Sequence, residues 1–379
     1  MKNLTLKLII VLTITTNLSF GQYQEVEKAF YDLYSNNQFN GTLLIGSLDS
    51  ITFAKSYGLA NAVSLEPISE QTTYNIASIS KQFTAAGIML LCDRSLLDLD
   101  DSASEYLADF PYKTITIRQL LNHTSGLHGY LHLWINNRRK KEPDFLTNKY
   151  ILNLFNEIKP ELDFSPGESF KYTNSGYLVL ASIIEAVSKT SFQDFLQKEL
   201  FIPLGFNSAY LVDPNDNVNK SLANRYTTDF KLIENKPPEG VYGDKNVALT
   251  IKDLFKWTRA YYGSQDFLSQ TMLSESKKPA VLNDNTLSNY GFAWTIDRSN
   301  KYHHSGSQRG FVSWVEVDEK KNRIIIILTN RSMSSVKSLA NIVNSILDNE
   351  ATKTLKPTKL ERKSLKAFEK KYRITNKKY

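Results

Sequence analysis

The segment Asn75–Thr84 reads NIASISKQFT and places a serine, Ser78, three residues before a lysine, Lys81. From Phe83 to Cys92 the chain continues FTAAGIMLLC, which is apolar or small on every side and predicts a helix buried all round. A serine at the start of such a helix lies beside free backbone N–H groups and the positive end of the helix dipole. The segment therefore presents a candidate nucleophile.

A lysine one helical turn after this serine faces the same side of the helix. Burial disfavours the charged ammonium and lowers the lysine pKa from about 10.4, so a buried Lys81 can act as the base. The spacing alone does not establish this chemistry, because Ser-x-x-Lys recurs at Ser274/Lys277 and Ser334/Lys337, in polar stretches. Taken by itself, the segment slightly favours a lysine at a helix start that reaches solvent.

Two downstream segments contain the other groups that this chemistry needs, a group to carry the proton and an oxyanion hole. The first reads FSPGESFKYTNSGY and places Tyr172 and Asn174 two residues apart, so that both can point into one cavity. The second reads HHSGSQRGF and directly precedes a predicted strand. There Gly306 lets a substrate lie against the backbone, and the N–H of Ser307 can pair with that of Ser78 to hold an oxyanion.

The three segments together resemble the serine β-lactamase and penicillin-binding-protein family, in particular its class C-like branch, over about residues 30–345. The family's first motif, Ser-x-x-Lys, matches Ser78 and Lys81, and its second, Tyr-x-Asn, matches Tyr172 and Asn174. A further similarity is the stretch LLNHTSGL at residues 120–127, which in the family shapes the fold and carries no chemistry.

The third motif departs from the pattern of true class C β-lactamases, in which it is Lys-Thr-Gly. Here it is His304-Ser305-Gly306, as in many family members that are not β-lactamases. A histidine with a reference pKa of about 6.5 is mostly neutral at pH 7, whereas a lysine carries a permanent charge. We therefore expect weaker recognition of a substrate carboxylate, unless Arg309 reaches into the site.

The resemblance implies a two-step acyl transfer. Ser78 attacks a carbonyl, and either Lys81 or the Tyr172 phenolate takes its proton. The N–H groups of Ser78 and Ser307 hold the oxyanion, and Asn174 positions the substrate. The expected function is that of a secreted serine hydrolase acting on an ester or amide of a small molecule or peptide, of the esterase or D-amino-acid peptidase type. The alternatives are a β-lactamase or DD-carboxypeptidase, and, in another class, a catalytically idle binding protein or covalent sensor.

The expected fold is α/β of the β-lactamase/transpeptidase type, with one antiparallel sheet built from both chain ends, flanked by helices, and a mainly helical lobe between them. Strands are predicted over residues 41–46, 51–57, 291–296, 311–317 and 323–328. Helices are predicted over residues 25–35, 177–187 and 335–347. Residues 79–285 are expected to be mostly helices and loops.

The chain ends differ from the body in composition. Residues 1–21, with an apolar stretch of 13 residues, are typical of a cleaved secretory signal, and the stretch is short for a membrane span of about 20 residues. We therefore expect a secreted, periplasmic protein without a span in the mature chain. Residues 22–350 form the expected hydrolase domain with a net charge of −4, and residues 351–379 form a basic tail of charge +9.

The same features exclude other functions. Because the positive charge belongs to the tail, the body presents no nucleic-acid surface. The tail is expected to be a solvated helix, with weak contact to a polyanion or membrane surface as the alternative. No Gly-x-Ser-x-Gly occurs, which excludes an α/β-hydrolase elbow. His128 and His132 have the i, i+4 spacing of metal ligands, but without HExxH we expect packing there, and no metal or cofactor.

Overall fold

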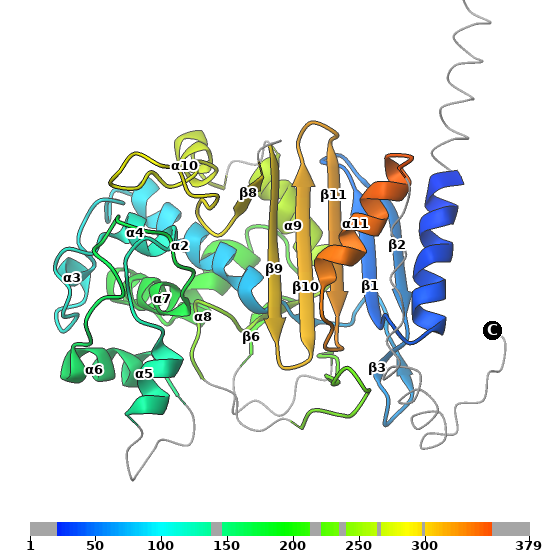
Figure 1. Ribbon diagram of the computed structural model, residues 1–379, viewed down its shortest axis with the longest axis horizontal. Coiled ribbons are helices and arrows are strands. Elements are labelled where there is room, and N and C mark those ends of the chain that lie inside the picture. Colours follow the sequence, from blue (N-terminus) through cyan, green and yellow to red (C-terminus); the bar gives the residue numbers. More distant parts are fainter. Residues whose placement is uncertain are drawn as a thin grey trace, which may run out of the picture.

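The two ends of the folded chain form one antiparallel sheet in the computed structural model, which describes residues 21–137, 146–212, 221–234, 240–263, 267–297 and 300–350. The strand order is β2-β1-β11-β10-β9-β8. The strands are β1 (Gly41–Gly46), β2 (Ile51–Tyr57), β8 (Thr295–Asp297), β9 (Lys301–Gln308), β10 (Phe311–Asp318) and β11 (Arg323–Thr329). The prediction of one sheet from both chain ends is confirmed, and Figure 1 shows the blue and orange strands side by side.

The central strand β11 alternates between two hydrophobic cores, as a strand covered on both faces must. Ile325 and Ile327 pack with the helix over residues 21–35 and with α11 (Val336–Leu347) on one face. Ile324 and Ile326 belong to the larger core on the opposite face, which extends into the helical lobe. The sheet therefore separates the terminal helices from the lobe, and its strand β9 lies along the edge of the lobe (Figure 1).

The helical lobe occupies the middle of the chain, as predicted. Its helices are α2 (Lys81–Asp93), α3 (Ala103–Tyr106), α4 (Ile117–Leu121), α5 (Tyr130–Asn136), α6 (Asn148–Ile158), α7 (Asn174–Ser188), α8 (Phe192–Leu196), η2 (Gln197–Phe201), α9 (Ile251–Tyr262) and α10 (Gln270–Ser276). Short strands β3 (Leu59–Asn61), β4 (Glu66–Pro67), β5 (Tyr74–Asn75), β6 (Tyr210–Leu211) and β7 (Val247–Leu249) complete the body.

Helix α2 is the centre of the lobe. Its residues from Lys81 to Leu91 are all buried, which confirms the helix predicted from FTAAGIMLLC. A Cβ on Gly87 would lie 2.8 Å from Ile184 Cδ1, so the glycine allows α2 to pack closely on α7. Because α2 is enclosed by neighbours, a polar side chain on its first turn can face only a cavity or other buried groups.

One strand prediction near the site needs correction. The strand expected over residues 291–296 is present only as β8, Thr295–Asp297. The HHSGSQ segment directly precedes the strand β10, as predicted, and is in addition itself part of the strand β9. Its polar residues and glycine have low strand propensity, and the strand forms because it pairs along its whole length with the apolar β10, from Gln308↔Phe311 to Lys301↔Asp318. Long-range pairing thus decides its structure.

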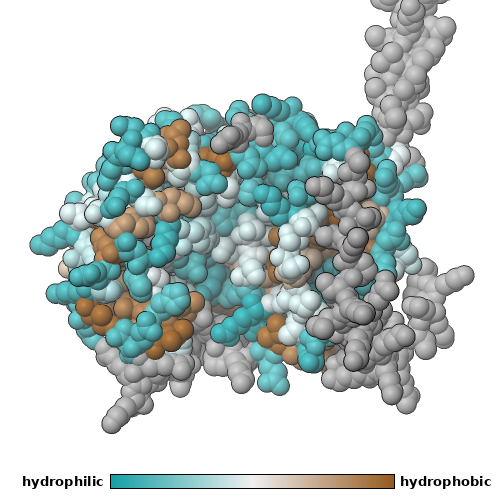
Figure 2. Space-filling model, viewed as in Figure 1, coloured by the Kyte–Doolittle hydropathy of each residue, from teal (hydrophilic) through white to brown (hydrophobic). Residues whose placement is uncertain are grey.

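The surface seen in Figure 2 is mostly hydrophilic over the described residues, with hydrophobic groups at lower left, where α5 and α6 lie in Figure 1. These two helices carry the exposed Ile135 and Ile158. Within the described part of the chain, no helix combines the length and apolar character that crossing a membrane requires. The predicted signal segment, apart from residue 21, and the basic tail lie outside the described residues.

Candidate active site

The candidate nucleophile lies in a tight turn that precedes α2. Ser78 belongs to the 3₁₀ turn η1 (Ala77–Ser80) and is partly exposed. The residue before it, Ala77, has a φ of 50°, in the left-handed region that L-residues other than glycine rarely adopt. Its N–H is held by the side-chain oxygen of Asn75 at 2.9 Å. The turn therefore fixes the serine at the lobe's edge, beside β9.

Lys81 is fully buried, and its amine has three neighbours with oxygen atoms. Nζ lies 2.8 Å from Asn174 Oδ1, 2.8 Å from the Asp244 carbonyl oxygen and 3.3 Å from Ser78 Oγ. A neutral amine donates two hydrogen bonds and keeps one lone pair. The two shorter contacts are to atoms that can only accept, so in the neutral amine they use both N–H groups and direct the lone pair at the Ser78 hydroxyl.

Burial also tunes the charge of this amine. It lowers the pKa of Lys81 from 10.5 to about 7, while the Asp244 charge raises the pKa and the Lys245 charge lowers it. About half of the amines are then unprotonated near neutral pH, which is the range in which a general base is effective. Geometry and electrostatics thus agree that Lys81 can accept the proton of Ser78.

Tyr172 lies in the loop before α7, with its ring centroid 5.0 Å from Lys81 Nζ. The residue is 41% exposed, yet loss of hydration around the phenol raises its pKa above 10.0. An interaction with the Ser78 hydroxyl acts in the opposite direction and is weaker. The phenol is therefore protonated at neutral pH, and it is better suited to donate a proton than to remove one.

The buried His304 of β9 is neutral, and both of its ring nitrogens are engaged. Nδ1 lies 2.7 Å from the Ser305 carbonyl oxygen, which can only accept, so Nδ1 carries the proton. Nε2 then accepts from the Tyr290 hydroxyl at 2.8 Å. Burial, with a smaller contribution from the charge of Lys81, lowers the pKa of His304 to about 3. The third motif therefore provides no positive charge at neutral pH.

The remaining predicted residues lie on the same stretch of β9 and its turn. A Cβ on Gly306 would lie 2.3 Å from the Ile76 carbonyl oxygen, so glycine allows β9 to approach the nucleophile's turn. Ser307 follows on the exposed part of this strand. Arg309 lies in the turn to β10 and is exposed. Burial lowers the pKa of Arg225, and the charge of Arg309 adds a smaller lowering. The structure thus gathers Ser78, Lys81, Tyr172, Asn174, His304 and Gly306 and leaves Arg309 at the rim.

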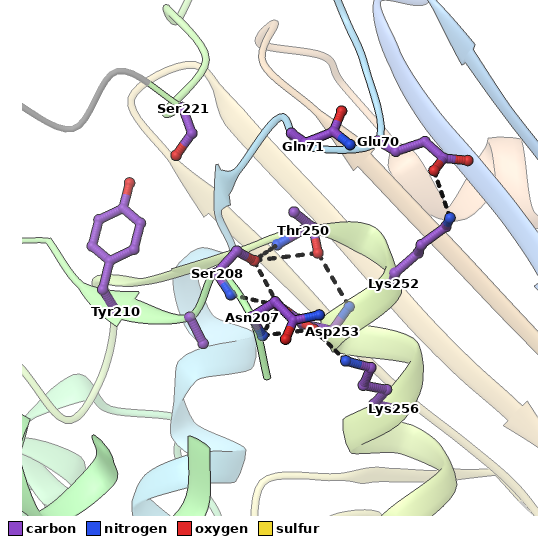
Figure 3. A pocket seen from close by; sticks show the side chains of 11 residues that line it. Glu70, Gln71, Asn207, Ser208, Tyr210, Ser221, Thr250, Lys252, Asp253 and Lys256 are labelled. Carbon is purple, nitrogen blue, oxygen red and sulfur yellow. Dashed lines mark hydrogen bonds and ion pairs between the residues drawn. The ribbon is translucent and has the colours of Figure 1, made fainter. Parts of the chain in front are cut away.

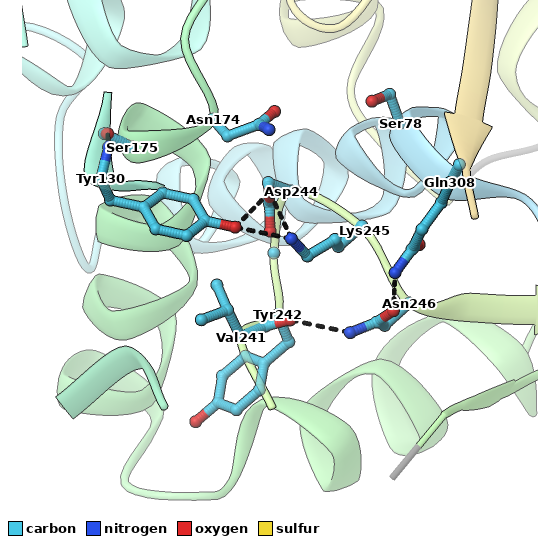
Figure 4. Close-up of polar contacts among 12 residues, drawn as sticks. Ser78, Tyr130, Asn174, Ser175, Val241, Tyr242, Asp244, Lys245, Asn246 and Gln308 are labelled. Atoms are coloured by element: carbon cyan, nitrogen blue, oxygen red, sulfur yellow. Dashed lines mark hydrogen bonds and ion pairs between the residues drawn. The ribbon is translucent and has the colours of Figure 1, made fainter. Parts of the chain in front are cut away.

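Three polar residues near the base were missed in the sequence. Asp244 gives its main-chain carbonyl to Lys81, and its Oδ2 accepts from the Tyr130 hydroxyl at 3.3 Å. Lys245 Nζ donates to the same hydroxyl at 2.6 Å (Figure 4). The available signal was weak, a Gly-Asp-Lys-Asn tetrapeptide before the short apolar run VAL. Tyr130 lies just after the LLNHTSGL stretch, which we expected only to shape the fold.

His123, within that stretch, supports Tyr172. The ring centroids of the two residues are 4.2 Å apart, and His123 Nδ1 accepts from the Thr173 N–H at 3.4 Å. Burial lowers the pKa of His123 well below 6.5, so the ring is neutral. The contact holds the loop that carries Tyr172, which gives this stretch a place beside the site.

Other polar clusters do not belong to this site. A cavity of about 750 Å³ is lined by Glu70, Ser208, Lys252 and Asp253, among others, next to the start of α9 (Figure 3). Asp253, at the centre of this cavity, accepts a hydrogen bond from Ser208 Oγ at 2.6 Å, so its carboxylate serves the local structure. His128 Nδ1 pairs with Asp163 at 2.9 Å, and the described residues contain no group of three or more potential metal ligands.

Comparison with known proteins places the chain. A family model described as Beta-lactamase matches residues 39–345. Penicillin-binding protein 4* of Bacillus subtilis (strain 168) is 29% identical over 330 residues, which cover 81% of this chain and 72% of that protein. The region matched by the family model contains every residue assigned above to the site.

Solved structures agree. A penicillin binding protein from Bacillus halodurans superposes with a TM-score of 0.70 at 25% identity, over 84% of this chain and 97% of that one. The D-amino acid amidase of Ochrobactrum anthropi SV3, solved with D-phenylalanine, gives a TM-score of 0.70 at 21% identity, over 86% and 99% of the two chains. The second likeness shows the fold alone.

Proposed function

The chain belongs to the beta-lactamase family, and from this premise we propose that it is a serine hydrolase that works through an acyl-enzyme on Ser78. The observation that carries the proposal is the arrangement of Lys81. Its buried amine is held by two acceptors at 2.8 Å and lies 3.3 Å from Ser78 Oγ. A neutral amine held in this way is a base aimed at one hydroxyl.

In the first step, Ser78 Oγ attacks the substrate carbonyl carbon while its proton passes to Lys81 Nζ. The negative charge that develops on the carbonyl oxygen is held by the N–H groups of Ser78 and Ser307. The tetrahedral intermediate then collapses and expels an alcohol or amine. The protonated Lys81, or the Tyr172 hydroxyl beside it, returns a proton to that leaving group, and the acyl group remains on Ser78.

In the second step, water attacks the acyl-enzyme and gives its proton to the basic group of the Lys81–Tyr172 pair. Because burial raises the pKa of Tyr172 and lowers that of Lys81, we assign the base in both steps to Lys81 and the proton donor to Tyr172. After each donation Tyr172 recovers its proton from the protonated Lys81 beside it, which makes the amine neutral again. Ser78 leaves with the returned proton, and the acid product departs. Asn174 accepts a hydrogen bond from the amine of Lys81, and we propose that it also positions the substrate.

We propose an ester or a D-amino-acid amide as the substrate, in preference to a penicillin. The support is His304, whose neutral ring has both nitrogens engaged and therefore offers no cation to a substrate carboxylate. Arg309 lies in the turn at the rim of the site. A site without a fixed cation at the third motif favours acyl donors that carry no carboxylate.

The test compares kcat/KM for short-chain p-nitrophenyl esters, D-amino-acid p-nitroanilides and nitrocefin with the mature protein. We expect the esters or anilides to be preferred, and a preference for nitrocefin would contradict the substrate assignment. Mass spectrometry of the Ser78 peptide during turnover should show an acyl adduct that disappears when substrate is exhausted. A stable adduct would instead indicate a covalent sensor, and no adduct with any donor would indicate an idle binding protein.

We also propose that the chain is exported and that its tail stays in solvent. The support is the composition of residues 1–21 and 351–379. Expression of the full chain in a Gram-negative host, followed by osmotic shock, tests export. We expect the periplasmic fraction to hold a product that begins near residue 22, and an uncleaved cytoplasmic product would contradict the proposal.

A further inference from the structure

The residues Asp244 and Lys245 form an ion pair next to the base, from a loop far from α2 in the sequence. Lys245 Nζ lies 3.7 Å from Asp244 Oδ2, and its side chain is only 10% exposed. Both charged groups contact the hydroxyl of Tyr130, at 2.6 Å from Lys245 and 3.3 Å from Asp244. Figure 4 shows the two side chains converging on that hydroxyl. The pair is thus anchored on the first residue of α5.

The backbone that carries the pair is fixed. Gly243 has a φ of 96°, and a Cβ there would lie 2.3 Å from the Tyr177 carbonyl oxygen and 2.6 Å from the Ala181 Cβ. Its own carbonyl oxygen accepts from Thr84 Oγ1, on α2, at 2.7 Å. The segment is therefore pressed between α7 and α2, and the Asp244 carbonyl that receives Lys81 has little freedom to move.

Stability does not account for the pair. Asp244 is 1% exposed, and its Oδ1 is buried without a hydrogen-bond partner among the described residues. A buried carboxylate that is only partly paired costs stability, and a well-packed apolar residue often serves better at such a place. Charged groups kept in this condition beside a catalytic base are typical of functional sites.

We propose that the Asp244–Lys245 pair, anchored on Tyr130, is the positioning device of the catalytic base, which fixes the direction of the Lys81 amine and sets its charge. The inference rests on the proposed function, in which Lys81 removes the proton of Ser78. The directional part is carried by the Asp244 carbonyl at 2.8 Å from Lys81 Nζ. The influence on the charge of Lys81 comes from the two side chains, of which Asp244 is negative and Lys245 is positive.

The other titratable groups around Lys81 are neutral near pH 7. The phenols of Tyr172 and Tyr177 lie toward it with ring centroids at 5.0 and 5.6 Å, and burial raises the pKa of both. Burial lowers the pKa of His123 and of His304, so these rings are uncharged. The charges that act on the base are then those of Asp244, which favours its protonation, and of Lys245, which opposes it.

The experiment uses two neighbouring substitutions whose effects should have opposite signs. The second-order rate of Ser78 labelling by a fluorophosphonate is measured between about pH 5 and pH 9, where its acid limb reports the base. In Lys245→Met the Lys81 amine loses a repelling charge and its pKa rises, so the acid limb of the pH–rate profile should shift to higher pH by about one unit. In Asp244→Asn the Lys81 amine loses an attracting charge and its pKa falls, so the acid limb should shift to lower pH by about as much.

Two further variants complete the cycle. Lys245→Arg keeps the charge and should keep the wild-type limb, and Asp244→Asn/Lys245→Met removes both charges and should bring the limb back toward that of the wild type. If Asp244→Asn does not fold, as judged by thermal unfolding, the contrast between Lys245→Met and Lys245→Arg decides.

Folded variants that lower the plateau rate without moving the limb, or that move it in the same direction, would overturn the inference and leave the hydrolase assignment intact. A wild-type protein that is not labelled at Ser78 would instead overturn the proposed function, and this inference with it.

Discussion

Two regions of this molecule share the spacing Ser-x-x-Lys and differ in the burial and the polar partners of the lysine. Lys81, at the start of α2, is fully buried with its amine on Ser78, Asn174 and the Asp244 carbonyl. Lys277, at the end of α10, is 21% exposed and pairs with Glu319 at 3.1 Å. Its amine also lies 4.2 Å from the centroid of a tyrosine ring. The spacing therefore carries no chemistry, and the surroundings of the lysine supply it.

The two serines differ as much as the lysines. Ser78 lies in a 3₁₀ turn in which the residue before it, Ala77, is in the left-handed region, and the turn presents the Ser78 hydroxyl to the amine of Lys81. Ser274 is an exposed residue in the regular helix α10. A matched pair of substitutions, one in each region, can therefore separate an effect of chemistry from an effect of losing a serine near a lysine.

The largest effect is expected at the serines. Ser78→Ala should abolish labelling by a fluorophosphonate and hydrolysis of p-nitrophenyl esters, because no other group can form the acyl-enzyme. Ser274→Ala should leave both rates unchanged. Gel fluorescence of the labelled protein measures the first and absorbance at the nitrophenolate band the second. Labelling of the Ser78→Ala protein at the wild-type rate would contradict the assignment of Ser78 as the nucleophile, and the contrast with Ser274 would be lost.

The next effect is expected at the lysines. Lys81→Met removes the base and should lower kcat/KM by roughly 10²–10⁴-fold. Lys277→Met should leave kcat/KM unchanged and act as the control for loss of a lysine. If Lys81→Met kept most of the activity and Tyr172→Phe lost it, the base would be the phenol, and the assignment of the two roles would be reversed.

Much of this contrast could be predicted from the sequence. The apolar run FTAAGIMLLC indicated that the helix after Ser78 is buried, and α2 confirms it. The strands β1, β2, β10 and β11 were predicted within a residue at each end, because alternation and β-branched residues are local signals. The three motif segments, which carry Ser78, Tyr172 and His304, lie together in the structure.

What could not be predicted depends on contacts between distant segments. The Asp244 carbonyl that holds Lys81 comes from 163 residues further along the chain. A main-chain oxygen leaves no mark in residue type, so its role is visible only in three dimensions. The same holds for β9, where polar residues form a strand because β10 lies beside them. The sequence predicted a mostly neutral His304, but the further lowering of its pKa follows from burial that its sequence neighbours do not reveal.

A smaller effect concerns stability and its dependence on pH. The Lys81 pKa is about 7 in the folded protein and 10.5 in the unfolded chain, so between these values only the unfolded chain binds the proton. The free energy of unfolding should therefore rise with pH from about 7 to about 10.5. Lys81→Met should remove this contribution and raise the free energy of unfolding at pH 7 by about 1–4 kcal/mol.

Urea unfolding at pH 7 and at pH 9 measures this, with Lys277→Met as the control. The control should change the free energy of unfolding by less than about 0.5 kcal/mol and keep the pH dependence of the wild type. A Lys81→Met protein that was less stable than the wild type at pH 7 would show that the buried amine contributes to the fold. The two regions would then differ less than their burial indicates.

The smallest effect is expected from the turn itself. Ala77 has a φ of 50°, and an L-residue held there costs about 1 kcal/mol relative to glycine, so Ala77→Gly should be neutral or stabilising by up to that amount. Ala85→Gly, in the regular part of α2, should be destabilising by about 1 kcal/mol. Urea unfolding of both variants gives the sign of the difference. Equal losses would mean that the turn stores no strain. Opposite signs would mean that the chain tolerates a strained residue to hold the Ser78 hydroxyl at Lys81, a constraint that the helical Ser274 does not carry.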